Sequence, residues 1–241
     1  MKGRNTLYTG IVSPTALLNK YSRPHKLQYC YCELAKSSQD YLNFYKEMAK
    51  IGKIVFLDLS PVMPRSSRGY DPSLVVSYAK VINPSYIVLP CFEYSHDKTV
   101  VMAQRAVNFF KAFLPEETQY MGLPQGTTKE EVIKCIKDLQ SIPGVSSIGM
   151  SASLELVAPR SHLLDSAKDP YYLDVYNSVD GEIPPSKVKG WITSFPIRLG
   201  IEGKRILDKC SQVPLDFSFA KDSNIIRSNV EDFLDVVGGI E

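Results

Sequence analysis

The sequence contains no long apolar run and no recognisable export signal. No stretch of about 18–20 apolar residues is present, which excludes an ordinary membrane-spanning helix. The first residues include Lys2 and Arg4, but the apolar core of a signal peptide does not follow them. We therefore expect a soluble, cytoplasmic protein that has no membrane partner.

The sequence also has few residues suited to disulfides, metals or phosphate loops. Its five cysteines, at positions 30, 32, 91, 135 and 210, form no CxxC pair, and its three histidines have no metal-ligand spacing. Neither a GxGxxG nor a Walker-type motif occurs, so a dinucleotide or nucleoside triphosphate site has no motif support. We expect a reducing compartment, no metal and no cofactor.

Short apolar runs alternate with segments of helical periodicity through most of the chain. Helices are predicted at 38–51, 98–113 and 128–140, the last opened by a capping box of Thr127 and Glu130. Nearly continuous apolar strands suit a parallel sheet buried on both faces, so the pattern favours a (β/α)₈ TIM-type barrel, with an open doubly wound sheet as the alternative. The eight predicted strands are 7–12, 27–33, 53–58, 86–90, 119–123, 145–149, 192–199 and 213–217.

Size and charge agree with one barrel domain. The 241 residues are close to the roughly 250 of a typical barrel, so we expect a single domain over residues 1–241. Lys and Arg exceed Asp and Glu by a formal charge of only +2. Charge alone therefore does not indicate a nucleic-acid-binding protein.

Two aspartates end apolar strands and are the first candidates for chemistry. Asp58 ends IVFLD and Asp216 lies near the end of VPLDF, so both are predicted at the mouth formed by the strand ends. A carboxylate at the end of a buried strand is costly unless it is paired or used. Either aspartate could instead cap a loop or pair with an arginine, and spacing does not decide between these roles.

Three residues after the fifth and sixth predicted strands could hold a flat ligand. Gln125 offers a donor and an acceptor suited to the amide-like edge of a heterocyclic base, and Gly126 lets a ligand approach the backbone. Gly149 and its small neighbours leave space for a planar group. A plain Pro-Gln-Gly turn is the equally good structural interpretation.

Cations gather on segments that we predict at the upper rim of the barrel. Two long polar connections, 61–72 and 158–190, each follow a strand end, and rim loops of barrels usually carry function. Such cations could contact phosphates, although a solvated rim explains them equally well. The predicted nucleic-acid-binding residues are Arg65, Arg68, Arg160, Lys187, Lys189 and Arg198.

Six short motifs in the same order resemble one known barrel family. They are LD at 57–58, VLP at 88–90, LPQG at 123–126, SIGMS at 147–151, IRLG at 197–200 and PLDFS at 214–218. Over roughly residues 25–235 the chain resembles the tRNA-guanine transglycosylase barrel. It is most similar to the compact phage and bacterial relatives that place 7-deazaguanine bases into DNA.

The resemblance implies roles for the matching residues. Asp58 matches an acid/base group near the base, and Asp216 matches the nucleophile that attacks the sugar C1′. The resemblance also implies a base pocket lined by Gln125, Gly126 and Gly149. Two departures stand out: Cys91 follows the fourth strand where the family has an aspartate, and no Cys or His follows Cys210 to form the family's zinc cluster.

The implied function is cleavage of an N-glycosidic bond in DNA, or alternatively in RNA, by base exchange or by base excision as a glycosylase. The target would be a modified base flipped out of the duplex, with a free nucleobase as product or co-substrate. Phage DNA modification or antiphage defence would suit this activity, performed by a monomer or a homodimer. The alternatives are an inactive barrel that binds nucleic acid or a protein partner, and an unrelated small-molecule barrel enzyme.

Overall fold

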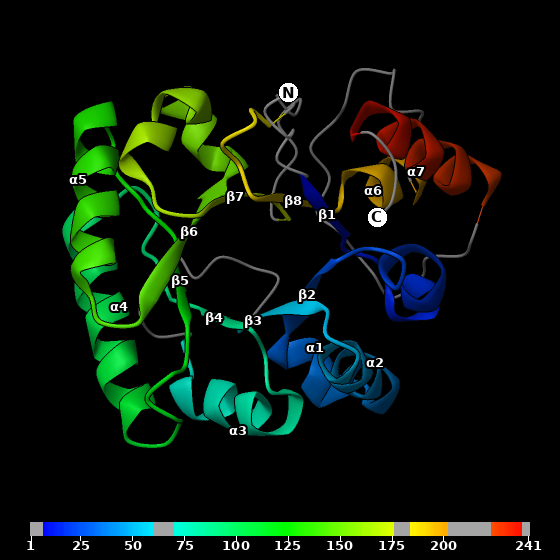
Figure 1. Cartoon of the computed structure of the whole chain (residues 1–241), viewed down its shortest axis with the longest axis horizontal. Coiled ribbons are helices and arrows are strands. Elements are labelled where there is room, and N and C mark those ends of the chain that lie inside the picture. Colours follow the sequence, from blue (N-terminus) through cyan, green and yellow to red (C-terminus); the bar gives the residue numbers. More distant parts are fainter. Residues whose placement is uncertain (1–6, 60–69, 176–183, 202–222, 238–241) are drawn as a thin grey trace, which may run out of the picture.

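The chain forms an eight-stranded parallel barrel (Figure 1). The computed structural model describes residues 7–59, 70–175, 184–201 and 223–237. The strands are hydrogen-bonded in the order β1-β8-β7-β6-β5-β4-β3-β2, and each hydrogen-bonded pair of neighbours is parallel. The predicted (β/α)₈ barrel is therefore confirmed. The strands are β1 Tyr8–Ile11, β2 Leu27–Tyr31, β3 Ile54–Asp58, β4 Tyr86–Val88, β5 Tyr120–Gly122, β6 Val145–Ser151, β7 Pro170–Asp174 and β8 Gly190–Thr193.

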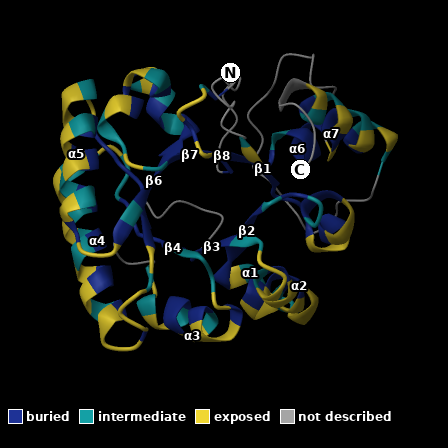
Figure 2. Ribbon diagram, in the orientation of Figure 1, coloured by how far each residue is buried: buried dark blue, intermediate teal, exposed yellow. Residues whose placement is uncertain are grey.

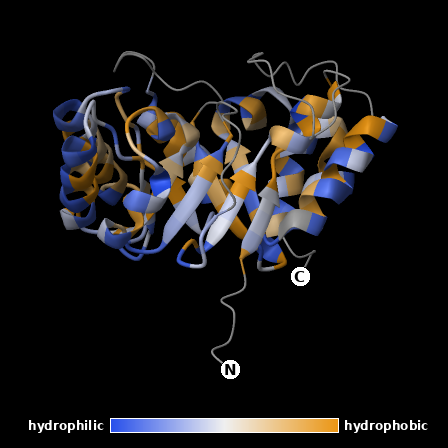
Figure 3. Cartoon of the chain, turned by 90° about the horizontal axis from the view of Figure 1, so that it is seen from above, coloured by the Kyte–Doolittle hydropathy of each residue, from blue (hydrophilic) through white to orange (hydrophobic). Residues whose placement is uncertain are grey.

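Helices surround the strands. Figure 2 shows the strands buried and the helices exposing one face to solvent, and Figure 3 shows the strands side by side between helices of mixed hydropathy. The helices are α1 Cys32–Ser37, α2 Gln39–Lys50, α3 Pro72–Ile82, α4 His96–Lys111, α5 Lys129–Ser141, α6 Phe195–Ile201 and α7 Asn224–Val237. Shorter turns are η1 Thr15–Leu17, η2 Leu18–Ser22, η4 Ala152–Leu156, η5 Arg160–His162 and η6 Leu164–Ser166.

Capping residues set several helix starts. Ser38 accepts a hydrogen bond from the Tyr41 N–H at the start of α2, and Asp71 caps α3. The capping box of α5 lies one residue later than predicted. Thr128 is the N-cap and accepts from the Glu131 N–H at 3.2 Å, while the Glu131 carboxylate accepts from the Thr127 N–H at 2.7 Å, so Glu131 takes the place predicted for Glu130.

The barrel interior is a packed aromatic core. Alternation along the strands points Tyr29, Phe56 and Tyr171 inward, and all three are buried. The Phe56 ring centroid lies 5.1 Å from that of Tyr86 and 5.1 Å from that of Tyr171. Side chains therefore fill the barrel, as in other barrels of this size, and leave chemistry to its ends.

The strand predictions fail in the last third of the chain. The predicted strand 192–199 is split: β8 ends at Thr193, whose Oγ1 accepts from the Phe195 N–H at 3.0 Å, and α6 follows with Pro196 in its first turn. The seventh strand, β7, was missed inside the polar stretch 158–190. The predicted strand 213–217 lies outside the described residues, and other segments supply all eight strands of the barrel.

Side chains close the barrel between β1 and β2, which are the two ends of the strand order. Within the described part of the chain, no strand ladder joins these two strands. Gly10 permits their close approach, because a Cβ there would lie 2.7 Å from the Leu27 carbonyl oxygen. Ser22 Oγ donates to the Ile11 carbonyl at 2.6 Å, and Gln28 Nε2 donates to the Ser22 carbonyl at 2.7 Å. We call this contact the β1–β2 seam.

A buried histidine completes the β1–β2 seam. His25 is 1% exposed, and its Nδ1 lies 2.8 Å from Thr9 Oγ1. Burial, and secondarily the charge of Lys53, lower the pKa of His25 from 6.5 to about 4. The folded protein therefore holds this imidazole neutral at pH values where the unfolded chain protonates it.

Acid should weaken the fold through His25. The neutral His25 imidazole contributes fully to stability above pH 6.5, which is its pKa in the unfolded chain. This contribution is lost as the pH falls toward 4, its pKa in the folded protein. Between pH 7.5 and pH 5 the free energy of unfolding should fall by about 2 kcal/mol from this group alone. Urea denaturation at the two pH values measures the loss, and the His25→Gln variant should lose less by about that amount. Equal losses in the two proteins would contradict the assignment.

Candidate active site at the barrel mouth

Three predicted site residues meet at the end of the barrel where the strands terminate. Asp58 is the last residue of β3, Cys91 lies in the loop after β4, and Gln125 lies in the loop after β5. All three are buried. Because parallel strands end at one face, residues far apart in sequence become neighbours at this mouth.

Two hydrogen bonds orient the Asp58 carboxylate. The Tyr29 hydroxyl donates to Oδ2 at 2.8 Å, and the Leu59 N–H donates to Oδ1 at 2.6 Å. Asp58 is only 9% exposed, so these donors replace water around its oxygens. Sequence reasoning missed Tyr29, although the alternation of Leu27, Tyr29 and Tyr31 on one strand indicates that all three face the interior.

A second phenol lies in the electrostatic field of Asp58. Burial, followed by the negative charge of Asp58, raises the pKa of Tyr70 well above its ordinary value. The Tyr70 hydroxyl is buried and has no hydrogen-bond partner within the described residues. Near neutral pH the buried Tyr70 hydroxyl therefore keeps its proton.

Protein contacts occupy both ends of the Gln125 amide. Its Oε1 accepts from the Tyr94 N–H at 3.3 Å, and its Nε2 lies 3.8 Å from Cys91 Sγ. The backbone N–H of Gln125 is 3.4 Å from Cys135 Sγ. Reading a base edge would require Gln125 to exchange these contacts for the ligand.

Cys91 is a buried neutral thiol. Burial, and next the charge of Asp58, raise the pKa of Cys91 above its ordinary value. A thiol held protonated is a poor nucleophile and a poor metal ligand. Cys91 is therefore an uncharged group at the position where the transglycosylase family, which this sequence resembles, has an aspartate.

Packing explains both predicted pocket glycines. A Cβ on Gly126 would lie 2.9 Å from the backbone nitrogen of Val132, so this glycine lets the loop pack against α5. A Cβ on Gly149 would lie 2.5 Å from Leu173 Cδ1 and 2.7 Å from Leu123 Cδ2. In this structure, side chains fill the space beside Gly149 that was predicted for a planar ligand.

Arg160 belongs to a buried ion-pair network rather than to an exposed rim. It is 1% exposed, Nη1 donates to Asp174 Oδ1 at 2.6 Å, and Nε donates to Glu155 Oε1 at 2.8 Å. Trp191 Nε1 donates to the other Asp174 oxygen at 2.6 Å. The network ties the segment after β6 to β7 and β8, which explains why a charged pair is buried here.

The prediction that Lys187 and Lys189 lie on the mouth rim is wrong. Both precede β8, and the Lys189 N–H donates to the carbonyl of Pro170 at the start of β7, so they lie at the opposite end of the barrel. Lys187 Nζ pairs with Asp165, and Lys189 Nζ pairs with Asp169 at 2.7 Å. The error comes from treating 158–190 as one rim loop, because residues that immediately precede a parallel strand lie at the end of the barrel where the strands begin.

The remaining predicted site residues are buried or not described. Arg198 is a buried residue of α6, with its Cζ 6.0 Å from the centroid of the Phe195 ring. Arg65, Arg68 and the predicted nucleophile Asp216 lie outside the described residues. Among the described residues, the last strand of the barrel is β8, which ends at Thr193.

Neither a metal centre nor a membrane span is found in the described ranges. No group of three His, Cys, Asp or Glu side chains there could hold a metal ion. No helix among those residues has the length and apolar character needed to cross a bilayer.

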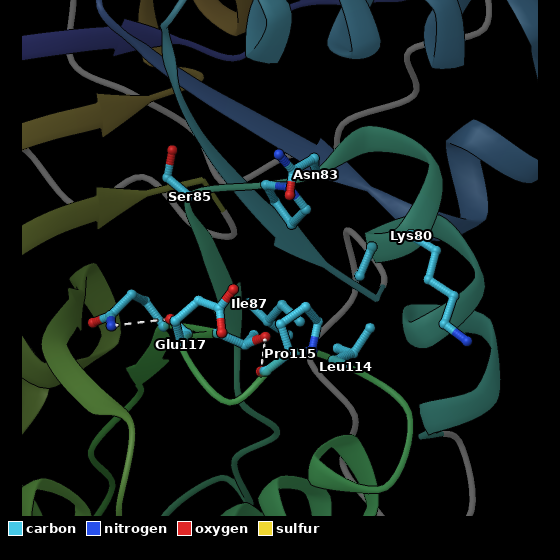
Figure 4. Close-up of a pocket in the computed structure, with 11 residues that line it drawn as sticks. Lys80, Asn83, Ser85, Ile87, Leu114, Pro115 and Glu117 are labelled. Carbon is cyan, nitrogen blue, oxygen red and sulfur yellow. Dashed lines mark hydrogen bonds between the residues drawn. The ribbon is translucent and has the colours of Figure 1, made fainter.

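A pocket of about 400 Å³ lies at the opposite end of the barrel (Figure 4). Ser85 and Gln119 line it, and these residues immediately precede β4 and β5. Figure 4 shows the Lys80 side chain extending away from Glu117, so the two charges do not converge on one ligand position. Since barrel active sites lie at the strand ends instead, the mouth at Asp58 is the better candidate.

Removing Arg160 should destabilise the fold strongly. Arg160→Met leaves the buried Asp174 carboxylate without its cation, which should cost about 3–5 kcal/mol in the free energy of unfolding. Urea denaturation followed by circular dichroism measures this cost, and adding Asp174→Asn should recover part of it. The control Lys187→Gln breaks an exposed pair and should hardly move the unfolding midpoint. Equal effects of Arg160→Met and Lys187→Gln would contradict the role of the network.

Comparison with known proteins adds no family to this description. The chain matches no protein-family model, and a search of curated proteins finds no match. The residues at the barrel mouth must therefore carry the functional assignment.

Proposed function

We propose that this chain is a DNA-acting enzyme that cleaves the N-glycosidic bond of a modified nucleotide, by base exchange or base excision. One observation carries the proposal: Asp58 is an inward-facing carboxylate at the end of β3, oriented by Tyr29 at the barrel mouth. The resemblance of LD, LPQG and PLDFS to transglycosylase motifs supplies the type of reaction.

Asp58 is suited to manage protons at the departing base. Glycosidic cleavage builds positive charge on the sugar while electrons pass to the base nitrogen, so an acid must protonate the leaving base. In the proposed mechanism Asp58 acts in its protonated form, gives this proton to the base nitrogen and becomes the carboxylate that later accepts a proton from water or from the incoming base. The Tyr29 hydrogen bond holds the carboxyl group in position in both protonation states.

A second carboxylate would attack the sugar. In the proposed mechanism a carboxylate oxygen of Asp216 bonds to C1′ as the C1′–N bond breaks, a role that rests on the resemblance alone. Water activated by Asp58 then releases Asp216 and leaves an abasic site, or an incoming base nitrogen does so and completes an exchange. Both routes return the two carboxyl groups to their initial state.

A catalytically inactive nucleic-acid- or partner-binding module is the second candidate. Three features of the predicted base pocket favour this candidate. Cys91 stands where the transglycosylase family has an aspartate, and the Gln125 amide is bonded to Tyr94 and Cys91. The side chains of Leu173 and Leu123 fill the space beside Gly149. DNA binding that persists in both Asp58→Asn and Asp216→Asn, with no base released by any variant or by the wild type, would support this candidate.

Asp58→Asn should abolish most base release. We expect a rate loss of roughly 10²–10⁴-fold, because the amide cannot donate or accept the catalytic proton. Tyr29→Phe should lose roughly ten-fold by removing one hydrogen bond to a charged group. Mass spectrometry of bases released from unmodified DNA, hypermodified phage DNA and tRNA, each with and without added 7-deazaguanine, measures these rates.

Asp40→Asn is the matched control, since Asp40 is an exposed carboxylate in the first turn of α2. Unfolding midpoints of all three variants separate catalytic loss from misfolding. Full base release by a folded Asp58→Asn protein would refute the assignment of the acid/base group.

A further inference from the structure

The loop between β4 and α4 presents an exposed aromatic side chain at the mouth end of the barrel. Tyr94 is 48% exposed, and its backbone has a φ of 58°. A bulky residue in this left-handed region is a conformational outlier. Such strain persists only where surrounding contacts hold it, and it gathers at ligand-binding sites.

Buried groups hold the loop on both sides of Tyr94. The Tyr94 N–H donates to Oε1 of Gln125, which lies buried against Cys91. On the other side, the Thr99 hydroxyl accepts from the Phe92 N–H at 2.9 Å and donates to the Phe92 carbonyl at 3.1 Å. The structure therefore holds the Tyr94 backbone in a strained conformation while leaving much of the side chain in contact with solvent.

A cation lies beside this aromatic surface. Lys98 Nζ is 4.3 Å from the centroid of the Phe92 ring. The neighbouring carboxylate of Asp97 is bound to His96 Nδ1 at 2.9 Å, while Glu93 lies between the two aromatic residues in sequence. Proteins bind single-stranded nucleic acids with aromatic faces beside cations, because bases stack on the aromatic rings and phosphates pair with the cations.

We propose that Tyr94, supported by Phe92 and Lys98, stacks on a base of single-stranded DNA at the mouth. We call these three residues the stacking rim. The inference rests on the nucleic-acid substrate of the proposed function and adds the residues that would hold the strand. A nucleotide taken out of a duplex loses its stacking neighbours, and an aromatic side chain can replace them without regard to sequence.

Binding measured without turnover tests the stacking rim. Fluorescence anisotropy with a labelled 20-nucleotide single-stranded DNA should show affinity falling about ten-fold in Tyr94→Ala and staying within about two-fold in Tyr94→Phe. Tyr8→Ala is the matched control, because Tyr8 is an exposed tyrosine at the start of β1, the opposite end of the barrel. Its affinity should equal that of the wild type.

Tyr94→Gly separates loss of stacking from loss of folding. Glycine adopts the positive φ without strain, so this variant should unfold at a higher urea concentration than Tyr94→Ala while binding equally weakly. For the cation, Lys98→Gln should reduce the slope of log affinity against log salt concentration by about 0.7. Lys111→Gln, at the other end of α4, should leave that slope unchanged.

The outcomes distinguish this inference from the proposed function. Wild-type affinity in Tyr94→Ala, or no binding of single-stranded DNA by the wild type, overturns the stacking rim even if base release is observed. Tyr94-dependent binding without any base release supports the stacking rim and overturns the proposed catalysis. Tighter, Tyr94-dependent binding of single-stranded RNA than of DNA would overturn the assignment of DNA as the occupant.

Discussion

The barrel depends on one contact that differs from all its others, the β1–β2 seam. Seven neighbouring strand pairs are joined by parallel ladders. The contact between β1 and β2 instead relies on Gly10, which has no side chain to keep the strands apart, and on hydrogen bonds donated by Ser22 and Gln28. Because β2 also carries Tyr29, the same seam positions the donor that orients Asp58. Closure of the fold and geometry of the candidate site are therefore coupled through one strand.

Several polar side chains that the sequence predicted to contact a ligand instead bond to other residues of the protein. Arg160 neutralises Asp174 in the buried layer outside the strands, and Gln125 fixes the backbone of Tyr94. These contacts occupy polar side chains that would otherwise be able to contact a substrate. Within the described residues, the Asp58 carboxylate lies at the mouth, and the Tyr70 hydroxyl is buried without a hydrogen-bond partner. Selectivity would then depend more on the rim than on the pocket floor.

The first six strands were predicted from sequence because each is a short apolar run bounded by turn residues. The prediction failed where that signal is absent. β7 is the segment PYYLD inside a long polar stretch, and the apolar run after Trp191 spans two elements because Thr193 and Pro196 favour a helix start. For the site, strand-end position correctly located Asp58, Cys91 and Gln125 at one end of the barrel. Their hydrogen-bond partners come from other strands and loops, so no local pattern could identify them.

Hydrophobic periodicity is a local property, so the residue pattern predicted the alternation of strands and helices as far as β6, favoured a parallel barrel over an open doubly wound sheet, and placed several polar residues at strand ends. Only the tertiary structure decided which of those polar residues are available. Arg160 and Asp174 are 14 positions apart, and they pair because the fold places η5, after β6, beside the end of β7. Lys187 and Lys189 lie away from the mouth because they immediately precede β8, and the Lys189 N–H bonds to Pro170 at the start of β7. Burial and pairing depend on contacts between segments distant in sequence, and that is why they emerge only when the chain is folded.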